Sequence, residues 1–237
     1  MKRHALRLAS RIVLPLLLAN LAHAQDSLHA HVDLTKGGKH QKDSSKAVIW
    51  LTPIGVSVKT PQQTQIPQLV QKNKSFQPSL LVIPAGGKVE FPNHDPFFHN
   101  VFSMFEGKRF DLGLYESGTT RFVQFDKPGI SFVFCNIHAE MSAVVIALAT
   151  PYYAISDAKG DVTIPDVPPG RYQLQVFHPS VPPGALRAMT REITVTAGQE
   201  SLGSFALDES DVLTAHKNKY GRDYDQPDPS SPAYSRP

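Results

Sequence analysis

The chain has 237 residues, with 24 Lys and Arg against 21 Asp and Glu, and a single cysteine. Four of the basic residues and none of the acidic ones lie in the first 24 positions, so the remainder carries 20 against 21, about one negative charge. This balance excludes the concentrated positive charge of a nucleic-acid-binding surface, and one cysteine excludes an internal disulfide. The length allows one or two domains.

The first 24 residues have the organisation of a secretory signal peptide. A basic stretch precedes the short apolar core Ile12–Ala19, and Ala22-His23-Ala24 is a small-x-small cleavage site. The apolar core is too short to cross a bilayer, and no later segment is long and apolar enough to do so. We therefore expect an exported, periplasmic protein that begins at Gln25 and has no transmembrane segment.

Beyond this leader, strand-like runs alternate with Gly, Pro, Asn and Asp, and the chain contains 20 prolines. The pattern predicts an all-β protein built from β-sandwiches. Residues His29–Leu34 and Ala47–Pro53 are expected to pair as strands, joined by the polar connection Lys36–Lys46. His29 and His31 would share one face of the first strand, where a solvated surface is preferred to a weak metal site.

The middle region, residues 61–150, contains most of the predicted strands. They are Gln65–Gln71, Leu80–Ile83, Lys88–Phe91, Asn100–Met104, Phe110–Tyr115, Thr119–Phe125, Ile130–Cys135 and Ser142–Leu148. Thr119–Phe125 alternates apolar and polar side chains, as a half-buried strand does. The strand pattern thus restarts at Gln65 after the first strand pair.

The last region begins near residue 150 and is again rich in strand signals. The predicted strands are Asp161–Ile164, Arg171–Phe177, Glu192–Val195 and Ser201–Leu207. After Asp208 the chain is rich in Asp, Lys, Ser, Tyr and Pro and has almost no aliphatic periodicity. This composition predicts a disordered tail over residues 209–237.

The only cysteine, Cys135, begins a motif in which His138 follows three residues later and Met141 three residues after that. His99 lies on a different predicted strand and would be brought in by the fold of a sandwich. One thiolate, two imidazoles and a thioether are the ligand set of a blue-copper electron-transfer site, with Met as a weak axial ligand. The motif predicts one type 1 copper ion, no open position for a substrate and therefore no enzymatic activity.

Zinc binding and nucleophilic catalysis also fit part of this motif. Cys135 and His138 could belong to a zinc site, although structural zinc takes several Cys or His ligands and no thioether. Cys135 could be a nucleophile activated by a histidine, in which case the position of Met141 would be accidental. A buried cysteine among unrelated histidines is the simplest alternative.

The residues around His99 leave two points open. His94 could replace or supplement His99 as a ligand, and His99 is preferred because Asn100-Val101 follows it and begins a strand. Phe97 and Phe98 are predicted either in the core or in an apolar docking patch around the copper.

The segment from Gln71 to Ala149 resembles the cupredoxins, in particular the plastocyanin and amicyanin group. The matching residues are Phe91 and Asn93, His99-Asn100-Val101, Pro128-Gly129, and the amicyanin-length loop Cys135-x-x-His138-x-x-Met141. The resemblance implies a Greek-key cupredoxin sandwich in which copper is held by His99, Cys135, His138 and Met141. It also implies that the Asn100 backbone N–H supports the Cys135 sulfur, as neighbouring hydrogen bonds tune such sites. The loop departs from the amicyanins in lacking their proline.

The flanking segments show a second resemblance. The motif Asp157-x-x-Gly160-x-Val162-x-Ile164-x-x-Val167-Pro168-x-Gly170-x-Tyr172-x-Leu174 is similar to the carboxypeptidase regulatory-like or transthyretin-like β-sandwich. It implies that residues 25–60 and 151–208 form one smaller sandwich, into which a cupredoxin domain of residues 61–150 is inserted. The rival arrangement has an N-terminal extension, a cupredoxin domain and a separate C-terminal domain.

These features together predict an exported protein that carries single electrons between redox proteins, such as a dehydrogenase or a cytochrome, through His138. The main alternative is a periplasmic copper carrier or sensor without an electron-transfer role. A third possibility is an adhesion or carbohydrate-binding sandwich that holds no metal. No nucleic-acid partner is expected, and the sequence indicates no oligomeric state.

Overall fold

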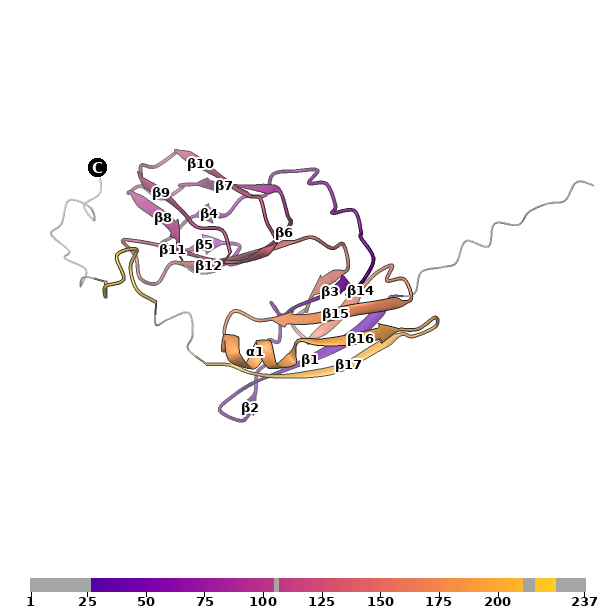
Figure 1. Cartoon of the computed structure of the whole chain (residues 1–237). Coiled ribbons are helices and arrows are strands. Elements are labelled where there is room, and N and C mark those ends of the chain that lie inside the picture. The colour runs from indigo at the N-terminus through magenta and orange to yellow at the C-terminus, as the bar shows by residue number, and fades with distance from the viewer. Residues whose placement is uncertain (1–26, 105–106, 211–215, 225–237) are drawn as a thin grey trace, which may run out of the picture.

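A computed structural model describes residues 27–104, 107–210 and 216–224 (Figure 1). These residues form an all-β protein with several sheets and one short helix, α1 (Pro183–Met189). Within these ranges, no helix has the length and apolar character needed to cross a membrane. The predicted signal peptide, residues 1–24, lies outside the described residues.

The first sandwich is built from two segments, residues 28–53 and 153–208, that flank the middle of the chain (Figure 1). Its strands are β1 (Leu28–Lys36), β2 (Lys39–His40), β3 (Val48–Pro53), β13 (Tyr153–Ile155), β14 (Asp161–Ile164), β15 (Gly170–Phe177), β16 (Arg191–Val195) and β17 (Ser201–Asp208). One sheet has the order β14-β1-β17, with β2 paired to β1, and the other has the order β13-β3-β15-β16. Val32, Leu51 and Leu174 are fully buried in the core that the two sheets share.

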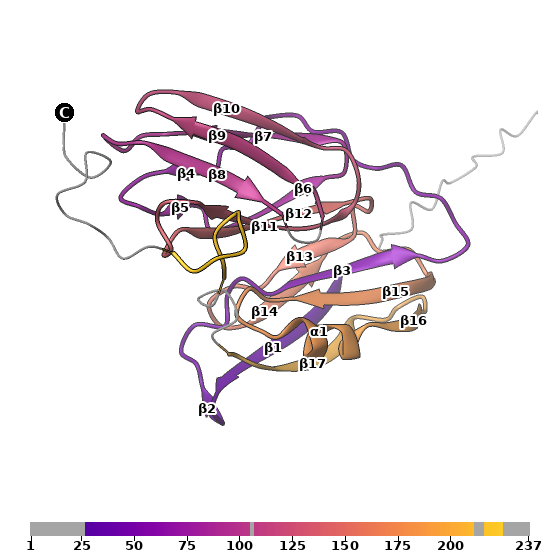
Figure 2. The same ribbon diagram turned by 60° about the vertical axis from the view of Figure 1, so that its left-hand side comes forward.

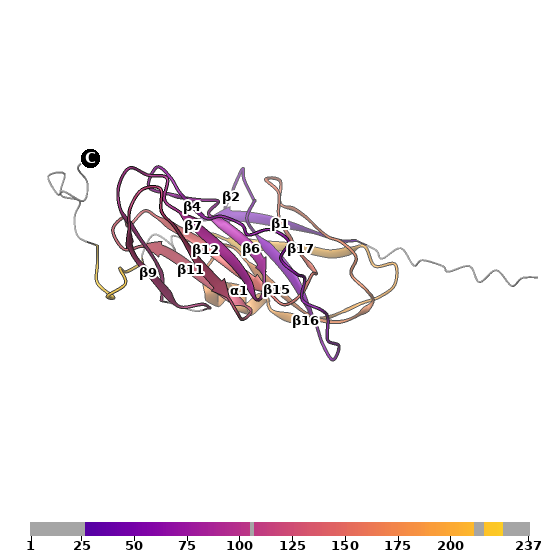
Figure 3. The same cartoon turned by 90° about the horizontal axis from the view of Figure 1, so that it is seen from above.

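The second sandwich contains the middle of the chain (Figure 2). Its strands are β4 (Val70–Gln71), β5 (Phe76–Gln77), β6 (Leu80–Pro84), β7 (Gly87–Pro92), β8 (His99–Ser103), β9 (Phe110–Tyr115), β10 (Thr120–Phe125), β11 (Gly129–Cys135) and β12 (Ser142–Leu148). A five-stranded sheet, β6-β12-β11-β8-β9, packs its apolar side chains against those of the β7–β10 pair. Figure 3 shows β9 and β16 toward opposite ends of the elongated molecule.

Strand β12 is buried on both faces and joins the two sandwiches. Val145 packs in the core of the second sandwich, whereas Val144 and Ile146 join the core of the first. Six consecutive residues of this strand are buried. A continuous apolar run is expected where a strand is covered on both sides, because neither face meets water. The sandwiches therefore share an apolar layer and are not joined by linkers alone.

The expected pairing of His29–Leu34 with Ala47–Pro53 is wrong. β1 pairs with β14 and β17, whereas β3 lies in the opposite sheet between β13 and β15. The backbone of β3 is buried, so its N–H and C=O groups need a partner strand on each edge. β3 pairs with β15 from Val48 to Pro53. One sheet therefore contains a strand from before the second sandwich and a strand from after it in the sequence. How the chain divides into domains stays a prediction.

The bounds of several strands agree with the expectation from sequence, notably Phe110–Tyr115, Ser142–Leu148 and Asp161–Ile164. The predicted run Gln65–Gln71 is a strand only at Val70–Gln71. Helix α1 was not predicted. It has seven residues and no side-chain N-cap, and its start is marked only by a proline in the first turn, where proline is tolerated.

The structure also differs from the expected disordered tail over the described residues 216–224. Asn218 and Arg222 form a backbone hydrogen bond of 2.9 Å, as do Gly221 and Asn218. This turn lies beside β11, as the yellow loop in Figure 2. Its polar and aromatic side chains make the contacts that order it, and a search for aliphatic periodicity in the sequence does not detect such contacts.

Candidate metal centre

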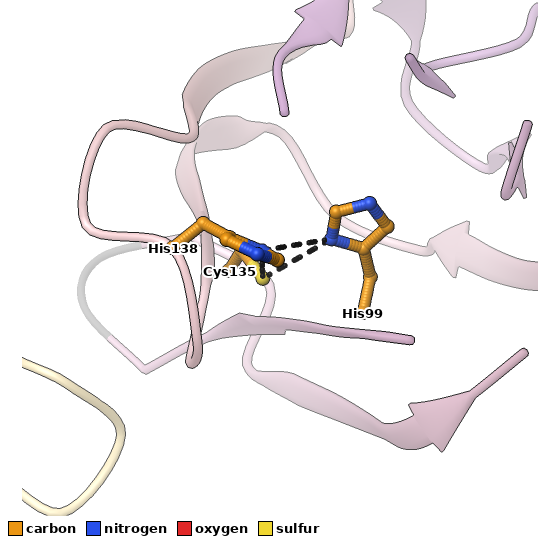
Figure 4. A group of neighbouring side chains, drawn as sticks. All are labelled: His99, Cys135 and His138. Carbon is orange, nitrogen blue, oxygen red and sulfur yellow. Dashed lines mark hydrogen bonds between the residues drawn. The ribbon is translucent and has the colours of Figure 1, made fainter. Parts of the chain in front are cut away.

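Three of the predicted ligands meet at one end of the second sandwich (Figure 4). His99 begins β8, Cys135 ends β11, and His138 lies in the loop before β12. The Cys135 Sγ atom is 3.6 Å from Nδ1 of His99 and 3.6 Å from Nδ1 of His138, and the two Nδ1 atoms are 3.2 Å apart. Pairing of β11 with β8 places Cys135 opposite Val101, which brings the start of β8 to the thiol.

The size of this triangle fits a first-row transition metal. For sides of 3.6, 3.6 and 3.2 Å, the point equidistant from the three atoms is about 2.0 Å from each, within the range of metal–imidazole bonds. All three side chains are buried, with exposed fractions of 0% for His99 and Cys135 and 3% for His138. A thiolate with two imidazoles in a trigonal arrangement is the strong ligand set of a blue-copper centre.

The loop that carries His138 is held by backbone hydrogen bonds across its base. The Cys135 N–H donates to the Met141 carbonyl at 3.2 Å, and the Met141 N–H donates to the His138 carbonyl at 3.0 Å. The side chain of Met141 is fully buried in the same apolar core as Cys135. The fold thus buries Met141 in the same core as Cys135, and its role as the axial ligand stays a prediction.

Asp95 orients His99, although no sequence pattern singled it out. Its Oδ2 atom lies 2.9 Å from Nε2 of His99, which donates the hydrogen bond and leaves Nδ1 with a lone pair toward Cys135. The buried carboxylate also accepts hydrogen bonds from the backbone N–H groups of Asn73 and Lys74. A carboxylate behind a metal-binding histidine fixes its tautomer and raises its basicity. The only signal in the sequence was an acidic residue four positions before His99.

Hydrogen bonds to Asp95 also explain its charge. Burial alone would raise the pKa of this carboxyl group, but the hydrogen bonds from Lys74, His99 and Asn73 outweigh it and hold the pKa below its ordinary value. Asp95 is therefore ionised at neutral pH. An ionised, buried carboxylate is stable here because each of its oxygen atoms has a donor.

Burial raises the pKa of the Cys135 thiol, and three backbone N–H groups oppose that shift. They belong to Asn100, Ile137 and His138. Without a metal the group is a thiol at neutral pH, so metal binding must release its proton. The three N–H groups are aimed to stabilise the thiolate once it forms.

Burial lowers the pKa of both histidines. For His138, burial and the neighbouring His99 bring the pKa to about 4, and for His99 burial outweighs the hydrogen bond to Asp95. Both imidazoles are therefore neutral at pH 7, the form that binds a metal. A set of neutral imidazoles around a buried thiol requires no loss of protons from the histidines on metal binding.

Aromatic rings surround His138, which is 3% exposed. The Phe97 ring lies 5.5 Å from the His138 ring and 5.3 Å from the His99 ring. Phe97 is half-buried, whereas Phe98 is 44% exposed and Glu140 is exposed. The aromatic pair thus spans from the metal centre to the surface.

Three histidines singled out by the sequence lie elsewhere. His94 is exposed in the loop before β8, and its backbone N–H donates to the Gln71 carbonyl at 2.9 Å. His29 and His31 are exposed on the same face of β1, paired with Thr163 and Asp161. In the part of the chain that the structure describes, none of these three histidines belongs to a group of three or more side chains that could hold a metal ion.

No protein-family model and no curated protein matches this sequence. Among solved structures, the chain is similar to a copper-containing nitrite reductase from Thermus scotoductus, at 24% identity and a TM-score of 0.35 over 42% of this chain and 26% of that one. A purple cupredoxin from Nitrosopumilus maritimus is similar at 22% identity and a TM-score of 0.32, over 35% of this chain and 99% of that one. An amicyanin from Paracoccus versutus is similar at 18% identity and a TM-score of 0.33, over 42% and 97%.

These neighbours are cupredoxins or contain copper by name, and the chain spans about a quarter of the nitrite reductase. With TM-scores below 0.5, the similarities assign neither a metal nor an activity to this chain. They give no support to a carboxypeptidase regulatory-like sandwich in the flanking segments. The case for a metal at this site depends on its own geometry.

Proposed function

We propose that this chain is a mononuclear type 1 copper protein that carries single electrons between redox partners. The observation that carries the proposal is the buried triangle of Cys135 Sγ and the two Nδ1 atoms of His99 and His138. Copper bound there would supply a Cu(II)/Cu(I) couple, and Met141 would be its weak axial ligand. The thiolate suits Cu(I), and the imidazoles also accept Cu(II).

The residues of the site would keep its geometry constant during electron transfer. Asp95 fixes the ring of His99, and the N–H groups of Asn100, Ile137 and His138 hold the sulfur. Ligands held on the ends of β8 and β11 have little freedom to rearrange when the charge of the metal changes. We propose no enzymatic turnover, because the buried ligand set offers no position for a substrate.

The alternative is a copper carrier or sensor without an electron-transfer role. Such a protein must release its metal, and release requires ligands that open to solvent or to a partner. The ligands here are buried on three different segments of the second sandwich, and Asp95 supports one of them from behind. Burial therefore favours a retained metal over an exchanged one.

The partners would be redox proteins of the same compartment, such as a dehydrogenase or a cytochrome. They would dock where Phe97 and Phe98 lead from the site to the surface. The periplasmic location rests on the signal peptide predicted for residues 1–24.

Voltammetry with a competing chelator separates the two functions. The copper-loaded protein should give a reversible one-electron wave, and the chelator should remove no copper during repeated reduction and oxidation. Loss of copper to the chelator on each reduction would overturn the electron-transfer proposal in favour of a carrier. Replacing Met141 with Leu should shift the potential with copper retained, since the axial ligand tunes the potential more than the affinity.

A further inference from the structure

The described C-terminal segment, residues 216–224, lies against the segment Cys135–Met141 between β11 and β12, which we call the Cys135 loop. The His216 ring stacks on the Phe134 ring at 4.0 Å between centroids, with the planes 27° apart. Its Nε2 atom donates a hydrogen bond of 2.8 Å to the Ala139 carbonyl. The segment thus contacts the residue before Cys135 and the residue after His138.

Tyr224 reaches the thiol residue itself. Its hydroxyl group donates a hydrogen bond of 2.9 Å to the Cys135 carbonyl and lies 3.2 Å from Nδ1 of His216. Two carbonyl groups of the Cys135 loop, at Cys135 and Ala139, are therefore bonded by side chains from a segment about eighty residues away. Backbone carbonyls need partners when water is excluded, and this segment provides them.

Lys219 completes a ring of contacts around the loop. Its Nζ atom lies 2.8 Å from Asp111 Oδ2, and its backbone N–H donates to Asn136 Oδ1 at 2.9 Å. Asp111 accepts a hydrogen bond of 2.6 Å from the side chain of Asn100, and the Asn100 carbonyl accepts one of 2.9 Å from the Asn136 N–H. The ring therefore runs from Lys219 through Asp111, Asn100 and Asn136 back to Lys219.

This ring includes the group that faces the sulfur. The Asn100 N–H opposes the raised pKa of the Cys135 thiol, and Asn136 is the next residue after Cys135. The ion pair between Lys219 and Asp111 is largely shielded, with side-chain exposures of 18% and 29%. A charge-assisted contact that is partly withdrawn from water holds its geometry better than an exposed one.

We propose that residues 216–224 form a clasp that positions the Cys135 loop, with Lys219 and Tyr224 as its positioning residues. The clasp holds Asn100 and Asn136 together, and with them the N–H groups that face the sulfur. Its effect on a bound copper rests on the function proposed above, whereas its effect on the thiol does not. Loosening the clasp should let the segment Cys135–Met141 open and expose the buried Cys135 side chain.

The test uses the full chain with Lys219→Ala, Tyr224→Phe and the rescue variant Lys219→Arg. Lys217→Ala is the matched control, because Lys217 pairs with Asp223 inside the segment and not with the loop. In the metal-free protein, the reaction of Cys135 with an aromatic disulfide reagent should become about tenfold faster in Lys219→Ala, as local opening becomes easier. Lys219→Arg and Lys217→Ala should react at the wild-type rate, with Tyr224→Phe between.

The copper-loaded variants give a second readout. Weaker N–H bonds to the thiolate should lower the reduction potential of Lys219→Ala and Tyr224→Phe and leave that of Lys217→Ala unchanged. Wild-type thiol rates in both variants would overturn the clasp. The clasp would also be overturned if Lys219→Ala reacted faster only because its global stability, measured in urea, had fallen by a matching amount. A wild-type protein that takes up no copper would end the proposed function, and the thiol rates would still decide the clasp.

Discussion

The two sandwiches differ most in what they bury. The first has a core of aliphatic and aromatic side chains. Its buried polar residues are Ser44, Thr150, Ser156 and His178. The second buries twice as many among the described residues: Gln71, Asn93, Asp95, His99, Asn100, Ser103, Ser131 and His138. Burying polar groups lowers stability unless each finds a partner. The second sandwich therefore maintains a polar site, and the first supplies apolar packing that supports it through β12.

The largest effect on stability is expected from the apolar core. Leu174→Ala removes a fully buried side chain of β15 and should lower the free energy of unfolding by about 2–5 kcal/mol. Because β12 belongs to both cores, denaturation followed by circular dichroism and by the visible copper band should give one coincident transition. Gln173→Ala, on the exposed face of the same strand, should change stability by less than about 0.5 kcal/mol. Two separate transitions would show that the sandwiches unfold independently and would contradict their coupling through β12.

A change behind His99 should weaken metal binding. Asp95→Asn keeps the shape of the side chain but removes the charge that orients Nε2 of His99, so copper affinity should fall about 10- to 100-fold. A competition titration against a chelator measures this. Asp126→Asn is the control, because that exposed carboxylate pairs with Lys108 and not with His99. Wild-type affinity in Asp95→Asn would show that the buried carboxylate does not support the ligand.

A smaller effect is expected from pH in the first sandwich. Burial lowers the pKa of His178, which stays neutral in the fold, where its ring contacts the Ser45 carbonyl at 3.1 Å. The unfolded chain takes up a proton below about pH 6.5, so the metal-free protein should lose stability as pH falls below that value. His178→Gln should make the loss shallower in urea titrations between pH 7 and pH 4. The same slope in His178→Gln as in the exposed-site control His40→Gln would contradict this role.

The sequence predicted the ligands better than their supports. Spacing alone picked out Cys135 and His138, because ligand types in a short loop are a local signal, and His99 was chosen because Asn100-Val101 follows it and begins a strand. Asp95 was missed, since one acidic residue in a loop has no distinctive pattern. Residues 216–224 were predicted to be disordered from their composition, whereas the residues that they contact, such as Asp111, lie about a hundred positions away in the sequence. Contacts of that range leave no periodicity in the chain.

For the fold too, local features were predicted better than long-range ones. Strand Ser142–Leu148 was found at its observed bounds because its apolar run is continuous. The pairing of the first two strands was wrong, since both His29–Leu34 and Ala47–Pro53 have the pattern of strands while only the tertiary fold decides their sheets. Individual strands are local features, and their partners are not.

Copper binding by Cys135, as a thiolate between two imidazoles, is the central claim. The most direct test is the visible absorption and EPR spectrum of the mature protein with one equivalent of Cu(II), measured beside Cys135→Ser. The wild type should show an intense thiolate-to-copper band and a narrow copper hyperfine splitting, and the variant should show neither. A pale spectrum of ordinary Cu(II), or a band that survives in Cys135→Ser, would contradict the claim.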